Sequence, residues 1–197
     1  MQREELFRER LLLASQSPRR AEILRAVGWP FETFSVEIDE STRAGESPES
    51  YVERLALGKA EAAVRERNAP LVLGADTTVV VGGEILGKPA SESDARDMLR
   101  RLNDRWHEVL TGVALVARNV EGDTRRSVAH ERTRVRFGLM SEREIDWYVN
   151  TGEPADKAGA YAIQGRAALF IEEIEGDYWN IVGLPIRLVY KLMQESR

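Results

Sequence analysis

The sequence predicts an α/β protein with a mixed, elongated sheet and flanking helices. Short apolar segments typical of strands alternate along the chain with amphipathic segments typical of helices. Two long strand-like segments, 108–117 and 128–137, are separated by the polar stretch 119–126, which favours a hairpin and so a sheet that is not purely parallel. The 197 residues are 43% hydrophobic and contain no repeat or Gly/Ser/Pro-rich linker, so we expect one domain over 1–197.

The first half of the chain predicts two strands that alternate with two helices, followed by a tight hairpin. Ser47 and Pro48 suit the N-cap and the first position of the second helix, and Gly82-Gly83 suits the hairpin turn. The expected elements are, in order, strand 11–14, helix 19–27, strand 31–38, helix 47–67, strands 71–73 and 79–81, and strand 84–86.

The second half predicts further helices around the long hairpin. A helix that begins at Ser91 or Ser93 places apolar residues at i, i+3, i+4 and i+7, counted from Ala95. The segment 152–165 is rich in glycine and small residues, which is typical of a shaped loop. The remaining expected elements are helix 141–150, strand 169–171 and a last helix that begins at Pro185.

The composition excludes several kinds of site. There is no cysteine, and the two histidines, His107 and His130, lie on separate predicted strands without metal-ligand spacing, which argues against a zinc site. A formal charge of -5 argues against binding to a nucleic-acid polymer. Since Met1–Glu5 is charged and no long apolar run occurs, we expect no membrane partner and a cytoplasmic protein.

Hydroxyl and guanidinium groups gather where the first predicted strand meets a helix. Ser17 is placed as N-cap and Pro18 as the first helical residue, with Ser15, Arg19 and Arg20 beside them. Main-chain N–H groups at a helix start, together with arginines, bind anions such as phosphate. The alternative is an ordinary helix cap with surface arginines.

A carboxylate, Asp76, interrupts the apolar run from Leu73 to Val79. An unpaired ionised carboxylate in a core costs several kcal/mol, so a cation, a basic side chain or water in a cleft must compensate it. Gly74 and Ala75 would let a ligand approach the backbone closely. Alternatively, Asp76 caps a turn or hydrogen-bonds to a bulge.

Single polar residues elsewhere are weaker candidates. Lys59 lies within a predicted helix and Lys88 follows the tight hairpin, although lone lysines are usually solvated. Asp39-Glu40 could hold a hard divalent metal but is more typical of a plain loop. The Gln164 amide has an acceptor and donors that match the edge of uracil or thymine, or it satisfies nearby backbone groups.

Taken together, these residues resemble the Maf (septum formation) family from about Leu11 to Leu192. The motifs that carry the resemblance are, in chain order, Ala14-Ser15-Gln16-Ser17-Pro18-Arg19-Arg20, Gly74-Ala75-Asp76-Thr77, Gly87-Lys88-Pro89, Thr111-Gly112-Val113, Asp156-Lys157-Ala158-Gly159-Ala160-Tyr161, Ile163-Gln164-Gly165 and Val182-Gly183-Leu184-Pro185.

The resemblance implies a nucleoside triphosphate pyrophosphatase that uses Mg²⁺ or Mn²⁺ and removes unwanted or modified nucleotides. It also implies a fold like that of the inosine triphosphate pyrophosphatases, with two lobes around a cleft, and a homodimer. The Ala-Tyr-x-Ile-Gln-Gly form is similar to that of the dTTP/UTP branch and unlike that of the branch acting on 7-methyl-GTP.

The resemblance also assigns roles to positions of this chain. Asp76 matches the catalytic acid/base that activates water, and it could instead hold the metal with Glu40. Three positions match those that the family uses for substrate selection: Arg19, Thr77 and Gln164. Two further positions, Lys59 and Lys88, match its phosphate-contacting lysines.

The sequence leaves two alternatives to this function open. The same residues could serve a regulatory protein that senses nucleotides or a cell-division partner, although a sensor needs no water-activating carboxylate. The enzyme could instead prefer CTP or modified pyrimidines, since the Gln164 amide can flip to suit several bases.

Overall fold

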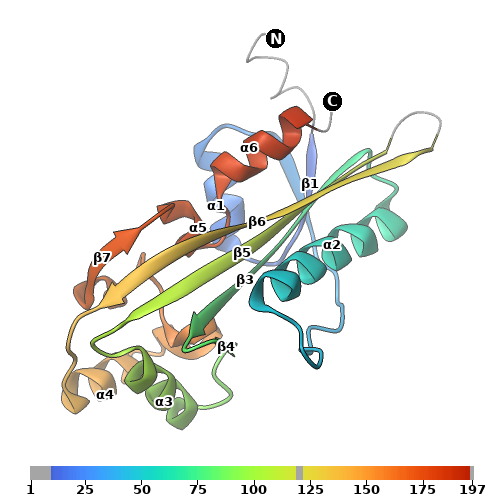
Figure 1. Cartoon of the computed structure of the whole chain (residues 1–197). Helices are drawn as coiled ribbons and strands as arrows, with labels where there is room; N and C mark the ends of the chain where they lie inside the picture. Colours follow the sequence, from blue (N-terminus) through green and yellow to red (C-terminus); the bar gives the residue numbers. More distant parts are fainter. Residues whose placement is uncertain (1–9, 119–121, 196–197) are drawn as a thin grey trace. The chain divides into compact units, whose positions relative to one another are not determined.

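The computed structural model describes residues 10–118 and 122–195, which form a mixed seven-stranded sheet with flanking helices (Figure 1). The expectations for Met1–Glu5 and for part of the 119–126 connection lie outside these residues. The strands are β1 (Leu11–Ala14), β2 (Phe31–Phe34), β3 (Leu71–Val81), β4 (Glu84–Leu86), β5 (Trp106–Arg118), β6 (Thr124–Phe137) and β7 (Ile171–Glu175). The helices are α1 (Pro18–Ala26), α2 (Pro48–Arg67), α3 (Glu92–Leu102), α4 (Glu142–Asn150), α5 (Tyr178–Val182) and α6 (Ile186–Glu195).

The strand order is β2-β1-β3-β5-β6-β7, and β4 pairs with β3. β1 pairs in parallel with both β2 and β3, whereas β4 is antiparallel to β3 and β7 is antiparallel to β6. The predicted mixed α/β class is therefore confirmed.

The chain divides into two compact units. The first unit comprises the described residues within Met1–Asp76, Thr111–Glu131 and Gly183–Arg197. The second unit comprises Thr77–Leu110 and Arg132–Val182. β3, β5 and β6 each contribute residues to both units. On β3 the boundary falls between Asp76, in the first unit, and Thr77, in the second.

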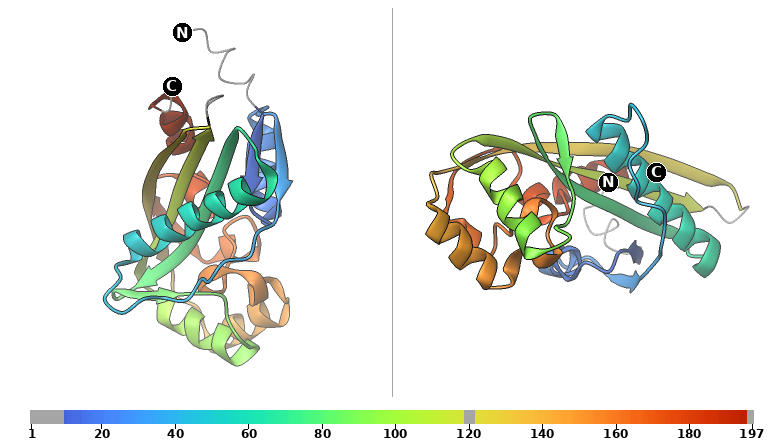
Figure 2. Two further views of the ribbon diagram at one scale, coloured as in Figure 1. Left: turned by 90° about the vertical axis from the view of Figure 1, so that its right-hand side faces the viewer. Right: turned by 90° about the horizontal axis from the view of Figure 1, so that it is seen from below.

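In the first unit, α2 packs unusually closely on the sheet (Figure 2). A Cβ atom placed on Gly74 would lie 2.1 Å from the carbonyl oxygen of Ala56, and one placed on Gly112 would lie 2.2 Å from that of Val52. Both glycines therefore let the backbone of α2 approach β3 and β5. The expectation that Gly74 makes room for a ligand is wrong on this face, because the helix fills the space.

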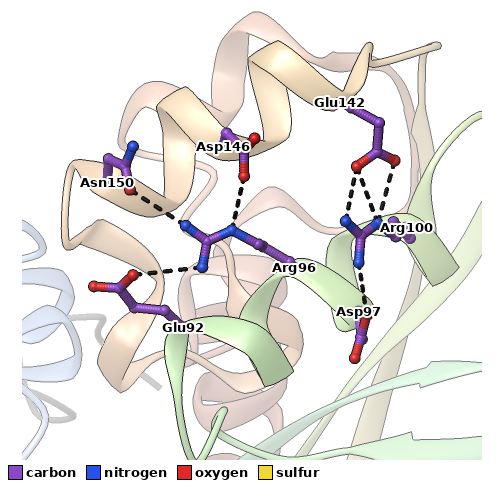
Figure 3. A network of polar contacts seen from close by, with 7 residues as sticks. All are labelled: Glu92, Arg96, Asp97, Arg100, Glu142, Asp146 and Asn150. Atoms are coloured by element: carbon purple, nitrogen blue, oxygen red, sulfur yellow. Dashed lines mark hydrogen bonds and ion pairs between the residues drawn. The ribbon is translucent and has the colours of Figure 1, made fainter.

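In the second unit, α3 and α4 lie side by side and are joined by a surface network of charges (Figure 3). Arg96 Nε donates to Asp146 at 2.8 Å, and Arg100 Nη2 donates to Glu142 at 2.8 Å. Single exposed ion pairs contribute little to stability, but a network restricts the relative rotation of the two helices. Beneath them the apolar core includes Val79, Leu99, Val109, Phe137, Tyr148 and Tyr161.

Three local expectations were wrong, and one helix was missed. The strands expected over 71–73 and 79–81 form one continuous strand, β3. The strand expected over 31–38 ends at Phe34, because Phe34 pairs with Ala14, where β1 also ends. The strand expected over 169–171 begins only at Ile171, since Leu169 ends a 3₁₀ turn and is 74% exposed. The short helix α5 was not predicted.

His107 on β5 is the most deeply buried histidine of the described chain. Its Nε2 lies 2.8 Å from the hydroxyl oxygen of Tyr161, and its ring packs edge-on against Phe137 and Tyr161. Burial lowers the pKa of His107 to about 4, because the charged imidazolium loses its hydration there. The imidazole is therefore neutral at physiological pH.

This burial makes stability depend on pH. The unfolded chain protonates His107 near pH 6.5 and the folded chain only near pH 4, so the stabilising contribution is fully present above pH 6.5 and is lost as pH falls toward 4. The wild type should lose about 3 kcal/mol of unfolding free energy from this group across that window. His107→Leu should lose correspondingly less when urea denaturation is compared at pH 7 and pH 4. Parallel pH profiles of the two proteins would contradict this role.

Candidate active site

The first unit brings two predicted acids together around one lysine. Lys59 Nζ lies 2.6 Å from Asp76 Oδ1 and 2.6 Å from Glu40 Oε1. The Asp76 and Lys59 side chains are only 11% and 13% exposed, whereas the Glu40 side chain is 53% exposed. A buried acid thus has its charge compensated by a buried ammonium, and an exposed acid lies at the edge of the group.

The backbone explains why these side chains meet. Asp76 lies two residues beyond Gly74 on β3, and Lys59 lies next to Ala60 on α2, whose backbone nitrogen would be 2.9 Å from a Cβ on Gly74. The close approach of helix and strand therefore lets the lysine reach the aspartate. The sequence predicted that a cation, a basic side chain or water would compensate the charge of Asp76, and the structure shows a basic side chain, Lys59.

Asp76 and Glu40 are also the acids that could hold a divalent metal. One oxygen of each carboxylate lies 2.6 Å from Lys59 Nζ. The two carboxylates therefore converge on one region, as ligands of one small cation must. Within 10–118 and 122–195, no group of three His, Asp or Glu side chains has metal-binding geometry. A pair of carboxylates still fits Mg²⁺, which often takes one or two carboxylates and completes its shell with water and substrate phosphate.

Arg20 connects three segments of the first unit. Its guanidinium donates to the Ser15 hydroxyl at 3.0 Å, to the carbonyl of Ala75 at 2.9 Å and to the carbonyl of Gly183 at 2.8 Å. Burial lowers the pKa of Arg20, and the negative charge of nearby Asp76 opposes that effect. Arg20 thus holds the residue preceding Asp76 in place, while its predicted contact with substrate stays a prediction.

α1 begins where the sequence predicts, but the hydrogen bonds at its start differ from those of an ordinary serine N-cap. Ser17 occupies the N-cap and Pro18 the first helical position, but the Ser17 side chain makes no capping bond. Instead, the Ser17 N–H donates to the Ser15 hydroxyl oxygen at 3.1 Å. Arg19 is partly exposed in the first turn, and its positive charge adds to the effect of burial in lowering the pKa of Arg20.

The second unit brings two of the sequence motifs together. The Gly159 N–H donates to the carbonyl of Gly87 at 3.0 Å, and Gly159 has a φ of +66° and packs against Val79 on β3. Lys88 follows Gly87 and is exposed. Thr77 is the next residue of β3 after Asp76 and is half-buried.

Gln164 is exposed in a turn that contains Ile163 and Gly165. Two residues that the sequence analysis missed, Tyr148 and Glu153, hydrogen-bond to the backbone on either side of this turn. The only signal for Tyr148 was its place on the inward face of a predicted helix. Glu153 gave no signal, because the backbone N–H groups that its carboxylate binds lie 13 and 14 residues farther along the chain.

Solved structures show the same fold. The Staphylococcus aureus Ham1 protein aligns with a TM-score of 0.54 over 96% of this chain and 100% of its own, at 14% identity. A HAM1 protein from Coxiella burnetii aligns with a TM-score of 0.54 over 95% of this chain and 99% of its own, at 16% identity. The predicted fold relationship is thereby confirmed at the level of architecture.

The sequence comparisons define the family. A family model described as "Maf-like protein" matches residues 10–196, so the chain belongs to the Maf family. The dTTP/UTP pyrophosphatase of Symbiobacterium thermophilum is 54% identical over 187 residues, which are 95% of this chain and 94% of that protein. That of Hahella chejuensis is 53% identical over 191 residues, 95% of this chain and 92% of that protein. The resemblance deduced from the motifs is confirmed.

Proposed function

We propose that this protein hydrolyses the α–β phosphoanhydride of dTTP and UTP and releases the nucleoside monophosphate and pyrophosphate. The observation that carries the proposal is the buried Asp76–Lys59 pair with Glu40 at its edge, in a chain over half identical along its length to dTTP/UTP pyrophosphatases. A buried carboxylate beside an ammonium suits water activation next to a polyphosphate.

The reaction needs a proton acceptor and compensation of negative charge. The oxygen of water forms a bond to the α phosphorus, and the bond from that phosphorus to the bridging α–β oxygen breaks. The pyrophosphate leaves with the bridging oxygen. In this proposal Asp76 orients the water and accepts its proton. The cations Lys59, Lys88 and Arg19 stabilise the charge that develops on the phosphate oxygens.

A divalent metal is part of the proposal. Glu40 would hold Mg²⁺ or Mn²⁺, joined by Asp76 in the alternative in which Asp76 is a metal ligand instead of the base, and the ion would neutralise phosphate charge as a Lewis acid. Base selection falls to Gln164, with Thr77 and Arg19 as further selecting residues, because an amide can donate to and accept from the edge of thymine or uracil.

We place this activity on free nucleotides in the cytoplasm, where it would remove unwanted or modified pyrimidine nucleotides, and we propose a homodimer as the assembly. As a separate observation, none of the helices within 10–118 and 122–195 has both the length and the apolar character of a membrane-spanning segment. Light scattering coupled to gel filtration tests the homodimer.

The test of the function is pyrophosphate release by the purified protein. The panel comprises dTTP, UTP, CTP, GTP, ATP and 7-methyl-GTP, each with Mg²⁺, with Mn²⁺ and with a chelator. We expect metal-dependent release from dTTP and UTP at least about tenfold faster than from the other nucleotides. Equal rates on all six would contradict the base preference, and no release from any would contradict the enzymatic function.

A further inference from the structure

The turn that carries Gln164 is closed by its own backbone hydrogen bonds and is also contacted by side chains from other segments of the second unit. The Gly165 N–H donates to the carbonyl of Ala162 at 3.0 Å, which closes the turn. The Gly165 carbonyl also accepts from the Ala168 N–H at 3.2 Å. Such short-range bonds shape an exposed turn but do not tie it to other segments, so contacts from those segments decide how the Gln164 amide is oriented.

Glu153 supplies such contacts on the C-terminal side of the turn. Its Oε2 accepts from the Arg166 N–H at 3.0 Å, and its Oε1 lies 3.5 Å from the Ala167 nitrogen, which also donates to it. These are the first N–H groups of the 3₁₀ turn Arg166–Leu169, so the carboxylate caps that turn.

The carboxylate also lies directly against the turn backbone. A Cβ on Gly165 would be 2.3 Å from Glu153 Oε1 and 2.4 Å from its Cδ. Glycine at 165 is what allows the carboxylate to reach the following N–H groups. The residue adjacent to Gln164 is therefore shaped to fit Glu153.

Tyr148 supplies the contact on the N-terminal side. Its hydroxyl donates to Glu153 Oε1 at 2.8 Å and accepts from the Ala162 N–H at 3.3 Å. The side chain is fully buried, and burial followed by the hydrogen bond to Glu153 raises the pKa of the Tyr148 phenol. The hydroxyl is thus a permanent donor to the carboxylate at physiological pH.

The helix that carries Tyr148 is itself fixed in place. The Ser141 hydroxyl accepts from the Glu144 N–H and Glu144 Oε2 accepts from the Ser141 N–H, which forms a capping box at the start of α4. The charge network to α3 holds the outer face of the same helix (Figure 3). A rigid helix thus supports the tyrosine, the carboxylate and the turn in sequence.

We propose that Glu153 and Tyr148 are positioning residues that fix the orientation of Gln164 and thereby set the preference of the enzyme for thymine and uracil. This inference rests on the proposed function, in which Gln164 selects the base. Neither residue is proposed to contact the nucleotide, so their effect passes through the backbone of residues 162–167.

Glu153→Gln is the first test, because the amide keeps the size of the side chain but replaces one acceptor oxygen by a donor group. We expect the ratio of kcat/KM for dTTP to that for dATP to fall about tenfold, mainly through a higher KM for dTTP, since a misplaced contact loses binding. Glu84→Gln is the matched control, because it makes the same change at an exposed side chain of the second unit that pairs with Arg101 at 2.7 Å and belongs to neither α4 nor the turn. Its ratio should stay within about twofold of wild type.

The combination with Gln164→Ala separates positioning from general destabilisation. If Glu153 acts through Gln164, the double variant should be no less selective than Gln164→Ala alone, because the two changes remove the same interaction. Tyr148→Phe is the second variant if Glu153→Gln folds poorly, and it should lower the same ratio. An unchanged ratio in the folded variants, while Gln164→Ala lowers it, would overturn the inference. Wild-type enzyme without dTTP preference would instead contradict the proposed function.

Discussion

Replacing Asp76 by asparagine is expected to lower kcat for dTTP by about 10³-fold while the protein stays folded. The amide cannot accept a proton from water, but it has the same size, and its oxygen can still accept a hydrogen bond from Lys59. Glu40 also continues to face the ammonium at 2.6 Å. Steady-state pyrophosphate release measures the effect, and far-UV circular dichroism checks the fold.

A matched control separates this effect from a general change of charge. Asp104→Asn removes one carboxylate from an exposed position where it pairs with Arg136 at 2.8 Å. Asparagine also suits the positive φ of 51° at this position. We expect its kcat to stay within about twofold of wild type. Near wild-type turnover by Asp76→Asn would refute the role assigned to Asp76.

Gly74→Ala is expected to have the largest effect on stability, at about 3 kcal/mol or more. The added methyl group would lie 2.1 Å from the Ala56 carbonyl oxygen and 2.9 Å from the Ala60 nitrogen, and these backbone atoms of α2 cannot rotate away. The helix must shift, and Lys59 shifts with it. Urea denaturation should show the lower unfolding free energy, and turnover should fall even where the protein is folded.

Gly87→Ala is the control for this substitution. No atom lies within 4 Å of a Cβ at Gly87, and its φ is not in the left-handed region. The alanine should leave stability unchanged or raise it by about 0.5 kcal/mol, because it restricts the unfolded chain. Equal stability of Gly74→Ala and wild type would contradict the packing described for α2.

The features that the sequence predicted well depend on residues close together in the chain. Ser47 and Pro48 define the start of α2 through a cap and a fixed φ, and the structure places the helix there. Ser141 and the glutamate three residues later likewise define the start of α4. Such signals act within one helical turn and need no knowledge of the tertiary fold.

The features that the sequence missed depend on distant partners. The strand after Phe31 is short because β1 ends, which the local alternation of 31–38 cannot show. The Asp76 carboxylate could be judged in need of a partner, but only the crossing of α2 and β3 identifies Lys59. Glu153 carried no signal, since the backbone N–H groups that its carboxylate binds belong to a turn formed by residues farther along the chain.

The proposed function requires that the chain cleaves dTTP between its α and β phosphates. The most direct test is ³¹P NMR of the products formed from dTTP by the wild-type protein with Mg²⁺. We expect dTMP and pyrophosphate in equal amounts, with no dTDP. Formation of dTDP and orthophosphate would contradict cleavage between the α and β phosphates. A complete absence of turnover would also contradict it, and if dTTP still raised the melting temperature, the protein would behave as a regulatory sensor.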